Sequence, residues 1–281
     1  MKFKVQAEMT YTANTAGTLI LNINALNNAT QSVVAEELRV TPEMDEEELK
    51  DIAGENRLIR MQISEPCNID ISYHATVDNG WRLVDMSGIK ETPVHQLPPE
   101  VLTYLHPSRY CQSDKLFRLA HNMFGDIDNP FVTVINMVEW IYTNIQYLSG
   151  STNSETSAFD TVTEQAGVCR DFAHLGIALC RALTIPARYF TGYAYKLHPA
   201  DFHACFEAYI GGSWILFDAT KLVPLNGMVK LATGRDAADA ALANIFGDII
   251  FNTMLVNCTL ADDAFKPFYY TSGSLQGISY S

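Results

Sequence analysis

Three residues of the types that perform nucleophilic catalysis follow one another along the chain: Cys169, His203 and Asp218. A cysteine thiol can attack a carbonyl carbon. A histidine can take the thiol proton and later protonate a leaving amine, and an aspartate can hold the imidazole in the required tautomer. Together they can perform acyl transfer through a thioester. Because long stretches of chain separate them, this chemistry requires a fold that brings the three side chains together.

The cysteine lies at the start of a predicted helix that runs from Gly167 to Leu183. Apolar residues recur three or four positions apart, which is the spacing of one helix face: Val168, Phe172, Leu175, Leu179 and Leu183. The other faces are also largely apolar, so the helix should be buried, and Pro186 ends it. A thiol in the first turn of a helix lies near free backbone N–H groups and the positive end of the helix dipole, which favour the thiolate.

The histidine and the aspartate lie on a predicted β-hairpin, with strands at 203–210 and 213–218 joined by a Gly-Gly turn. A two-residue loop places Cys205 opposite Asp218. Since side chains alternate along a strand, His203, Cys205 and Asp218 should share one face, with the backbones of His203 and Asp218 about 7–8 Å apart. A carboxylate can reach an imidazole across that gap, but a slip of one residue in the register would separate them.

The sequence around the cysteine resembles the nucleophile motif of the transglutaminase-like superfamily. The resemblance is carried by Gly-Val-Cys-Arg-Asp-Phe-Ala-His-Leu at 167–175 and continues over 178–189. The segment His203–Tyr209 is similar to the family's histidine motif, and Trp214–Thr220 is similar to its aspartate motif. The order of the three residues also agrees, and the resemblance covers about residues 115–255.

This resemblance implies an α+β fold with a papain-like core, in which the buried nucleophile helix packs on an antiparallel sheet. It implies a cysteine-dependent acyl hydrolase, similar to the bacterial transglutaminase-like cysteine proteases. In that enzyme Cys169 is the nucleophile, His203 shuttles the proton and Asp218 orients His203. We therefore expect a protease or amidase that acts on peptide or isopeptide amides of a peptide or protein substrate, without a cofactor. By the same resemblance, Tyr147 is a candidate donor to the oxyanion.

Two positions depart from the family pattern. Cys205 stands where the family commonly has tryptophan, and Ala219 stands where proline commonly follows the aspartate. Neither change removes a catalytic group. Cys205 enlarges the space beside His203 and places a second thiol near the site, so we expect Cys205 and Trp214 to shape the substrate pocket.

Two alternatives stay open at the level of sequence. A protein-glutamine acyltransferase, that is, a transglutaminase, would form the same thioester and pass the acyl group to an amine rather than to water. The choice of acceptor depends on the shape of the pocket, which the motifs do not describe. A binding module that has kept the fold without catalysis belongs to a different class, although all three catalytic residue types are present.

The sequence predicts no metal site. Its six cysteines contain no C-x-x-C pair, which is the usual spacing in structural zinc sites. His198, Asp201 and His203 could be imagined as ligands, but the segment that holds them is short and bent by a proline. Asp126 and Asp128 do not build a calcium loop of the required length.

The first part of the chain is rich in predicted strands, separated by turn clusters: Met1–Thr12, Thr18–Leu26, Gln31–Thr41, Arg57–Ser64 and Asn68–Val77. The acidic segment Glu43–Asp51 is expected to be a loop or a short exposed helix. Short strands at this spacing suggest an antiparallel β-sandwich, and the region resembles the N-terminal domain of bacterial family members. We therefore divide the chain into a β-rich domain, residues 1–96, and a transglutaminase-like catalytic domain, residues 97–281.

Further elements are predicted around the motifs. Residues 80–112 should be an irregular linker, and 221–248 should be mostly loop. Helices are expected at Asp114–Phe124, Phe131–Leu148 and Ser157–Gln165, and further strands at Ala187–Lys196 and Asp248–Ala261. Within the second loop region, Arg235, Asp236 and Asp239 resemble a loop that lies near the site in the family. We expect an ion-pair brace there, with substrate binding as the alternative.

Composition restricts the kinds of partner. The chain has 281 residues and a formal net charge of −13, which argues against nucleic acid and against an anionic membrane surface as partners. No signal peptide is visible at the N-terminus, and no apolar run reaches the roughly 18 residues of a membrane span. The scattered cysteines do not resemble a disulfide framework, so we expect a cytoplasmic, reduced protein.

Overall fold

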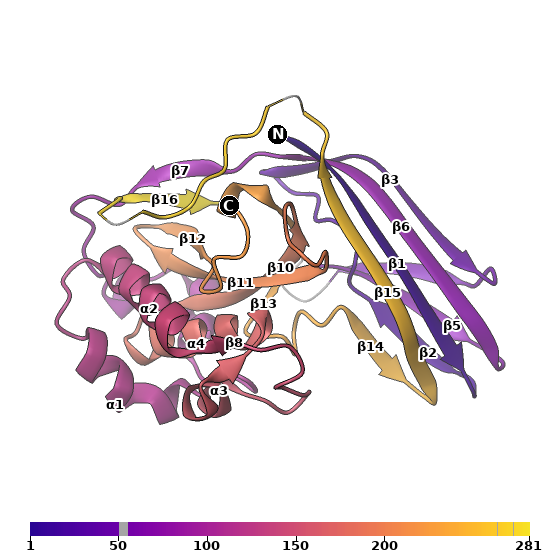
Figure 1. Ribbon diagram of the computed structural model, residues 1–281, viewed down its shortest axis with the longest axis horizontal. Helices are drawn as coiled ribbons and strands as arrows, with labels where there is room; N and C mark the ends of the chain where they lie inside the picture. Colours follow the sequence, from indigo (N-terminus) through magenta and orange to yellow (C-terminus); the bar gives the residue numbers. More distant parts are fainter. Residues whose placement is uncertain (51–55, 263, 272) are drawn as a thin grey trace.

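Two antiparallel sheets form one end of the molecule, beside the helices (Figure 1). The structure is a computed structural model that describes residues 1–50, 56–262, 264–271 and 273–281. The first sheet has the order β15-β1-β6-β3, with strands at Ile249–Leu260, Lys2–Ala13, Cys67–Asn79 and Gln31–Thr41. The second has the order β14-β2-β5-β4, with strands at Ala243–Phe246, Gly17–Leu21, Arg57–Ile63 and Glu46–Lys50.

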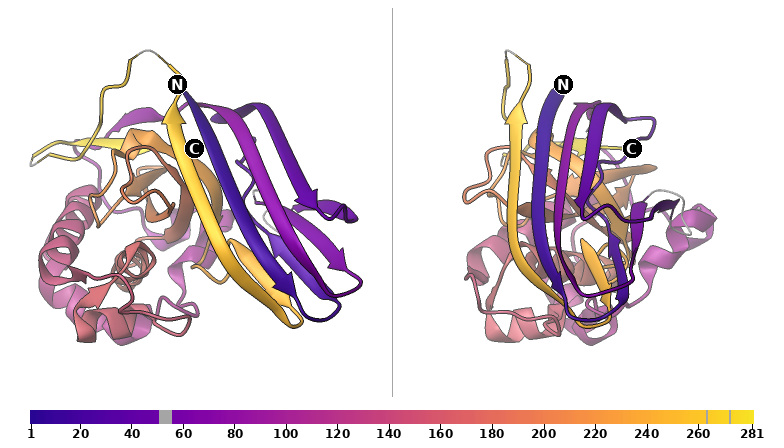
Figure 2. Two further views of the ribbon diagram at one scale, coloured as in Figure 1. Left: turned by 45° about the vertical axis from the view of Figure 1, so that its right-hand side comes forward. Right: turned by 90° about the vertical axis from the view of Figure 1, so that its right-hand side faces the viewer.

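Alternating burial along these strands produces a sandwich core. Every second side chain of β1 is buried, from Phe3 to Ala13, and β6 continues the pattern from Ile69 to Val77. Buried residues of β2 and β5 belong to the same core cluster. Because a period of two puts these side chains on one face of each sheet, the two sheets bury their apolar faces together (Figure 2). The predicted antiparallel sandwich is thus confirmed.

The acidic segment after β3 corrects one prediction. Residues 46–50 form the edge strand β4, paired with β5, rather than a loop or helix, and Asp51 lies outside the described residues. Ion pairs with Arg57 explain how this acidic segment can form a strand. The guanidinium forms ion pairs of 2.8 Å with both Glu36 and Glu48, and charged side chains are common on edge strands. The strand predicted at 18–26 ends earlier, at Leu21.

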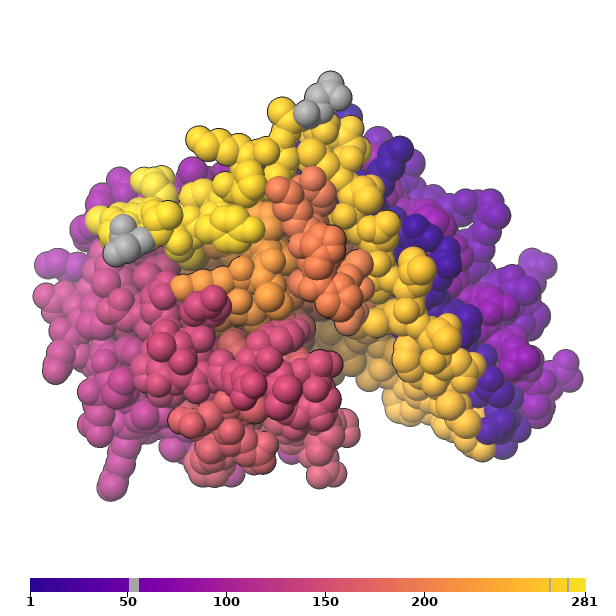
Figure 3. Space-filling view, viewed as in Figure 1, coloured from indigo at the N-terminus to yellow at the C-terminus, as the bar shows by residue number. Residues whose placement is uncertain are grey.

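Strands from the end of the chain complete both sheets of the sandwich. β15 pairs antiparallel with β1, and β14 pairs with β2. Residues 243–260 therefore lie in the two sheets that the N-terminal strands build, although they follow the catalytic motifs in sequence. The boundary at residues 96 and 97 stays a prediction. On the face shown in Figure 3, a notch separates the helical half from the edge formed by β14 and β15.

A third antiparallel sheet carries the hairpin. Its order is β12-β11-β10-β13, with strands at Ser213–Phe217, Phe202–Ile210, Ala187–Ala194 and Met228–Gly234. β13 and β14 correct the prediction that residues 221–248 are mostly loop. All seven residues of β13 are buried, so the strand lacks the alternation by which an exposed strand is recognised.

The helices pack on this sheet and on one another. They are α1 at Ser113–Phe124, α2 at Pro130–Asn144, α3 at Ala158–Glu164 and α4 at Cys169–Ala182. α4 is buried along almost its whole length and contacts β11. A Cβ added at Gly176 would lie 2.4 Å from the Phe206 ring, so glycine permits the close approach. No helix among the described residues is long and apolar enough to cross a membrane.

Short elements fill the connections. The predicted linker contains strand β7 at Arg82–Asp85 and the 3₁₀-helices η1 at Val94–Gln96 and η2 at Pro99–Leu105, and β7 pairs with β16 at Gln276–Ser279. A further 3₁₀-helix, η3, lies at Leu225–Gly227.

The helix predicted to end at Leu148 stops at Asn144. The chain then forms β8 at Gln146–Tyr147, which pairs in parallel with β9 at Ala166–Gly167. This pairing carries Tyr147 to the start of α4.

Candidate active site

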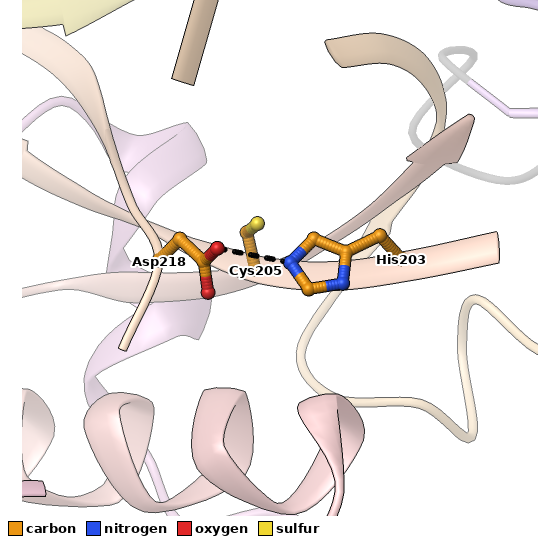
Figure 4. A group of neighbouring side chains, drawn as sticks. All are labelled: His203, Cys205 and Asp218. Carbon is orange, nitrogen blue, oxygen red and sulfur yellow. Dashed lines mark hydrogen bonds and ion pairs between the residues drawn. The ribbon is translucent and has the colours of Figure 1, made fainter. Parts of the chain in front are cut away.

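The hairpin has the predicted register. Ile210 lies opposite Ser213, and the pairing continues back to Phe206 opposite Phe217. His203 and Asp218 extend this ladder, and their side chains meet: His203 Nε2 lies 3.0 Å from Asp218 Oδ2 (Figure 4). Both side chains are buried. The geometric argument from the Gly-Gly turn is thus confirmed.

Thr220 fixes the orientation of the Asp218 carboxylate. Its backbone N–H donates to Asp218 Oδ1 at 2.9 Å, and its hydroxyl donates to the same oxygen at 2.7 Å. The other oxygen, Oδ2, is thereby directed at His203. Sequence reasoning missed Thr220, although a turn in which an aspartate side chain bonds the backbone two residues on is a known signal.

The pKa values of the pair shift in opposite directions. Burial lowers the pKa of His203, but the Asp218 carboxylate, Cys205 and Cys169 raise it, and the net pKa is well above its ordinary value. Burial raises the pKa of Asp218, but the His203 charge and the hydrogen bonds from His203 and Thr220 lower it, and the net pKa is below its ordinary value. The site therefore favours an imidazolium paired with a carboxylate.

One ring nitrogen of His203 is not used by the contact with Asp218. Since Nε2 is bonded to Asp218, the available nitrogen is Nδ1, which is buried and has no hydrogen-bond partner among the described residues. The Cys169 side chain is one of the groups that raise the pKa of His203, which places the thiol beside the ring. Cys169 is the first residue of α4 and is partly exposed to solvent.

Asp171 holds the start of α4 in place. Its fully buried carboxylate accepts a hydrogen bond from the Val168 backbone N–H at 2.9 Å and contacts the Arg170 guanidinium at 3.2 Å. An acidic side chain in the first helical turn satisfies a free N–H group and matches the helix dipole. The carboxylate thereby fixes the turn that carries Cys169.

Tyr147 lies at the same helix start. Burial raises its pKa, and Cys169 raises it further, so the phenol and the thiol are neighbours. Its ring centroid lies 5.8 Å from that of Phe172, and its side chain is 45% exposed. Tyr147 is therefore a partly exposed neighbour of Cys169 at the start of α4.

The other cysteines near the site are buried. Cys205 is 1% exposed, and burial raises its pKa to about 12. It lies next to His203 and Asp218 and packs in an apolar cluster, so it does not line an open substrate surface. Cys180, on α4, contacts the Met137 sulfur at 3.8 Å within the core.

The structure corrects the prediction for Trp214. Trp214 lies opposite Tyr209 on the hairpin, six residues along β11 from His203, which is about 20 Å of extended strand. It packs against the rings of Tyr104 and Tyr209 and the Arg188 guanidinium. Trp214 therefore belongs to a separate cluster and does not shape the pocket at His203.

The predicted brace is present only in part. Arg235 forms an ion pair with Asp239 at 2.8 Å. Asp236 instead accepts hydrogen bonds from the backbone N–H groups of Tyr110 and Ala238, each at 2.9 Å. The segment fixes the loop that follows β13.

Comparison with known proteins identifies the family. Residues 1–100 match the profile of the bacterial transglutaminase N-terminal domain, and residues 118–219 match that of the transglutaminase-like superfamily. The chain is 54% identical to a Cytophaga hutchinsonii protein whose crystal structure was described as that of a candidate cysteine protease. The alignment covers 100% of this chain and 98% of that chain, with a TM-score of 0.98. The chain belongs to the transglutaminase-like superfamily.

Weaker similarities are also found. The uncharacterized protein ML0607 of Mycobacterium leprae is 29% identical over 149 residues, which are 49% of this chain and 52% of that protein. The chain thus spans about half the length of this relative. The periplasmic domain of Pseudomonas aeruginosa TgpA, solved with bound ethylmercury, is 16% identical, with a TM-score of 0.41 over 77% of this chain and 90% of that chain.

Proposed function

We propose that the chain is a cysteine-dependent acyl hydrolase, a protease or amidase, that cleaves peptide or isopeptide amides through a thioester intermediate. One observation carries the proposal: His203 is bonded to Asp218 through Nε2 at 3.0 Å, its Nδ1 is buried without a partner among the described residues, and Cys169 is near enough to raise the pKa of the ring. A nucleophile, a base and a group that orients the base are the parts that this chemistry needs.

In the first step, neutral His203 takes the proton of the Cys169 thiol on Nδ1, which gives the Cys169 thiolate and the imidazolium that Asp218 stabilises. The sulfur attacks the amide carbonyl carbon, which becomes tetrahedral, and the carbonyl oxygen takes the negative charge. Backbone N–H groups at the start of α4 and the Tyr147 hydroxyl are the donors that stabilise this oxyanion, and donors fixed in advance are most effective in this role.

In the second step, His203 Nδ1–H donates its proton to the amide nitrogen, and the C–N bond breaks. The amine leaves and the acyl group remains on Cys169 as a thioester. A water molecule then gives a proton to Nδ1 and attacks the thioester, which releases the carboxylic acid and restores the thiol. Throughout the cycle Asp218 keeps the imidazole in one orientation and stabilises its charged form.

A peptide-library assay tests the proposal. Wild type should cleave a subset of peptides, and Cys169→Ala should cleave none at a measurable rate. Cys67→Ala is the matched control, because Cys67 is another partly exposed cysteine but lies on β6 of the sandwich. Full activity of Cys169→Ala on a cleaved peptide would remove the basis of the proposal.

The same assay distinguishes hydrolysis from acyl transfer. With a primary amine added to the reaction, a hydrolase releases mainly the free acid, whereas a transglutaminase releases mainly the amide of the added amine. The product ratio, measured by mass spectrometry over a range of amine concentrations, decides between the two. A chain that is only a binding module yields neither product.

A further inference from the structure

Three kinds of group that bind zinc converge behind the catalytic cysteine. The ligand atoms of His203, Cys205 and Asp218 all lie within 4.8 Å of one another, and the three side chains are buried (Figure 4). Cys205 and His203 project from the same face of β11 because they are two residues apart, and Asp218 directly follows β12. Imidazole nitrogen, thiolate sulfur and carboxylate oxygen are the atoms that coordinate zinc in proteins.

The spacing of two of these atoms suits a bound cation. His203 Nε2 and Asp218 Oδ2 are 3.0 Å apart. Zinc lies about 2.0–2.2 Å from nitrogen and oxygen ligands, so the ion fits between these two atoms with a small movement. Thr220 holds the other carboxylate oxygen through two hydrogen bonds, which is the outer-shell support that orients carboxylate ligands.

A small cavity is lined in part by Asp218, and Cys169 is not among its lining residues. It has a volume of about 40 Å³ and lies between α2 and the segment that follows Asp218. Among the residues that line it are Asp218, Val138, Val223, Tyr269, Glu139 and Lys221. The Lys221 ammonium would repel a cation, but it is paired with the Glu139 carboxylate at 2.6 Å.

We propose that His203, Cys205 and Asp218 form an inhibitory site for Zn²⁺, reached through the cavity at Asp218. His203 Nε2, Cys205 Sγ and Asp218 Oδ2 are the protein ligands, and a water molecule completes a tetrahedral set. Starting from the imidazolium, binding releases two protons: one from the Cys205 thiol and one from Nε2. The remaining ring proton stays on Nδ1.

Inhibition follows because zinc occupies the two atoms, His203 Nε2 and Asp218 Oδ2, whose contact orients the base. With zinc on both atoms, Asp218 no longer holds the imidazole, and the ring can no longer form the imidazolium that Asp218 stabilises. This consequence rests on the proposed function, whereas the binding of zinc does not.

Direct measurement of zinc binding tests the site. The full chain, as wild type, Cys205→Ala and Cys169→Ala, is titrated with ZnCl₂ in competition with a chromophoric chelator. We expect one zinc per wild-type chain, the same affinity in Cys169→Ala, and a loss of more than about 100-fold in Cys205→Ala, since even outer-shell changes cost 10–100-fold. Loss of binding in Cys169→Ala with retention in Cys205→Ala would overturn the proposal, and so would equal binding in all three.

Cobalt(II) binding gives a second readout, and circular dichroism of the same samples detects a misfolded variant. A thiolate-to-cobalt charge-transfer band should appear in wild type and in Cys169→Ala and be absent from Cys205→Ala, while the circular dichroism of the three proteins is the same. If Cys205→Ala does not fold, Cys205→Ser replaces it, because a hydroxyl does not give that band. A band that persists in a folded Cys205 variant contradicts the site.

Inhibition by zinc is tested by measuring the cleavage of a peptide substrate. Zinc should abolish cleavage by wild type, and a chelator should restore it. Zinc that binds at Cys205 without lowering the rate would overturn the inhibition. Because binding is measured without substrate, a chain with no hydrolase activity would disprove the proposed function and leave the zinc test unaffected.

Discussion

His203 Nε2 bonds to Asp218 Oδ2 at 3.0 Å, and this single contact determines which ring nitrogen faces the nucleophile. The bond leaves Nδ1 as the only nitrogen that can exchange a proton with Cys169. It also sets the ionisation of the pair, because the carboxylate raises the pKa of the histidine well above its ordinary value in spite of burial.

Asp218→Asn should lower the pKa of His203. Without the carboxylate, burial is the largest influence and lowers the pKa, and turnover should fall by about 10²–10⁴-fold, the scale of such changes in other catalytic triads. NMR titration of the His203 ring measures the pKa, and peptide cleavage measures turnover. Asp114→Asn is the control, because Asp114 is an exposed carboxylate on α1. Equal effects of the two substitutions would contradict the assignment.

The stability that the pair contributes should depend on pH with a definite sign. His203 has a raised pKa in the folded state, so its contribution is complete below its ordinary value of 6.5 and is lost as pH rises through the folded value. Asp218 has a lowered pKa, so its contribution is present above its ordinary value of 3.8 and is lost as pH falls through the folded value. The pair therefore stabilises most between about pH 4 and 6.5.

Urea unfolding of wild type and Asp218→Asn over a pH series measures this contribution. The difference in the free energy of unfolding should be largest in that window and should shrink in both directions. A difference that grows as the pH rises above 6.5 would show that the pair is not ionised as the structure indicates.

Tyr147→Phe should reduce turnover more than it changes KM. The substitution keeps the ring on Phe172 and removes only the hydroxyl, and loss of one oxyanion donor costs about 10²–10³-fold in turnover in other enzymes. Steady-state kinetics on a cleaved peptide measures both parameters. Tyr142→Phe is the matched control, because Tyr142 is an exposed tyrosine of α2. Unchanged turnover in Tyr147→Phe would exclude the hydroxyl from the reaction.

Gly176→Ala should destabilise the fold by about 1–3 kcal/mol, the usual cost of overpacking a core. The added methyl group would lie 2.4 Å from the Phe206 ring, so α4 must move away from β11. Phe206→Leu removes atoms at the point of collision. A double-mutant cycle is measured by urea unfolding. The variant with both substitutions should have a higher free energy of unfolding than the sum of the two single changes predicts. Additive effects would show that the two residues are not in contact.

The nucleophile helix and the hairpin could be predicted because local rules determine them. Apolar residues at helical spacing marked α4, and a two-residue turn fixed the register that brings His203 to Asp218. Thr220, two residues after the aspartate, is the local sequence signal for the turn that orients the carboxylate.

The closure of the sandwich could not be predicted from local pattern. β15 was expected to be a strand, but its partner is β1, more than two hundred residues away. In β13, Lys230 interrupts the apolar run that would mark a buried strand. Its ammonium is buried because it pairs with Glu207 of β11 at 3.1 Å, and no feature near Lys230 in the sequence indicates that distant partner.

Trapping of the acyl-enzyme tests the central claim most directly. Wild type is mixed with a cleaved peptide or an activated acyl ester, quenched in acid, digested and analysed by mass spectrometry. The acyl group should be found on the peptide that contains Cys169, should be released by neutral hydroxylamine as expected for a thioester, and should be absent from Cys169→Ala. An acyl group on another residue, such as Cys205, or cleavage that continues in Cys169→Ala would contradict the assignment of Cys169 as the nucleophile.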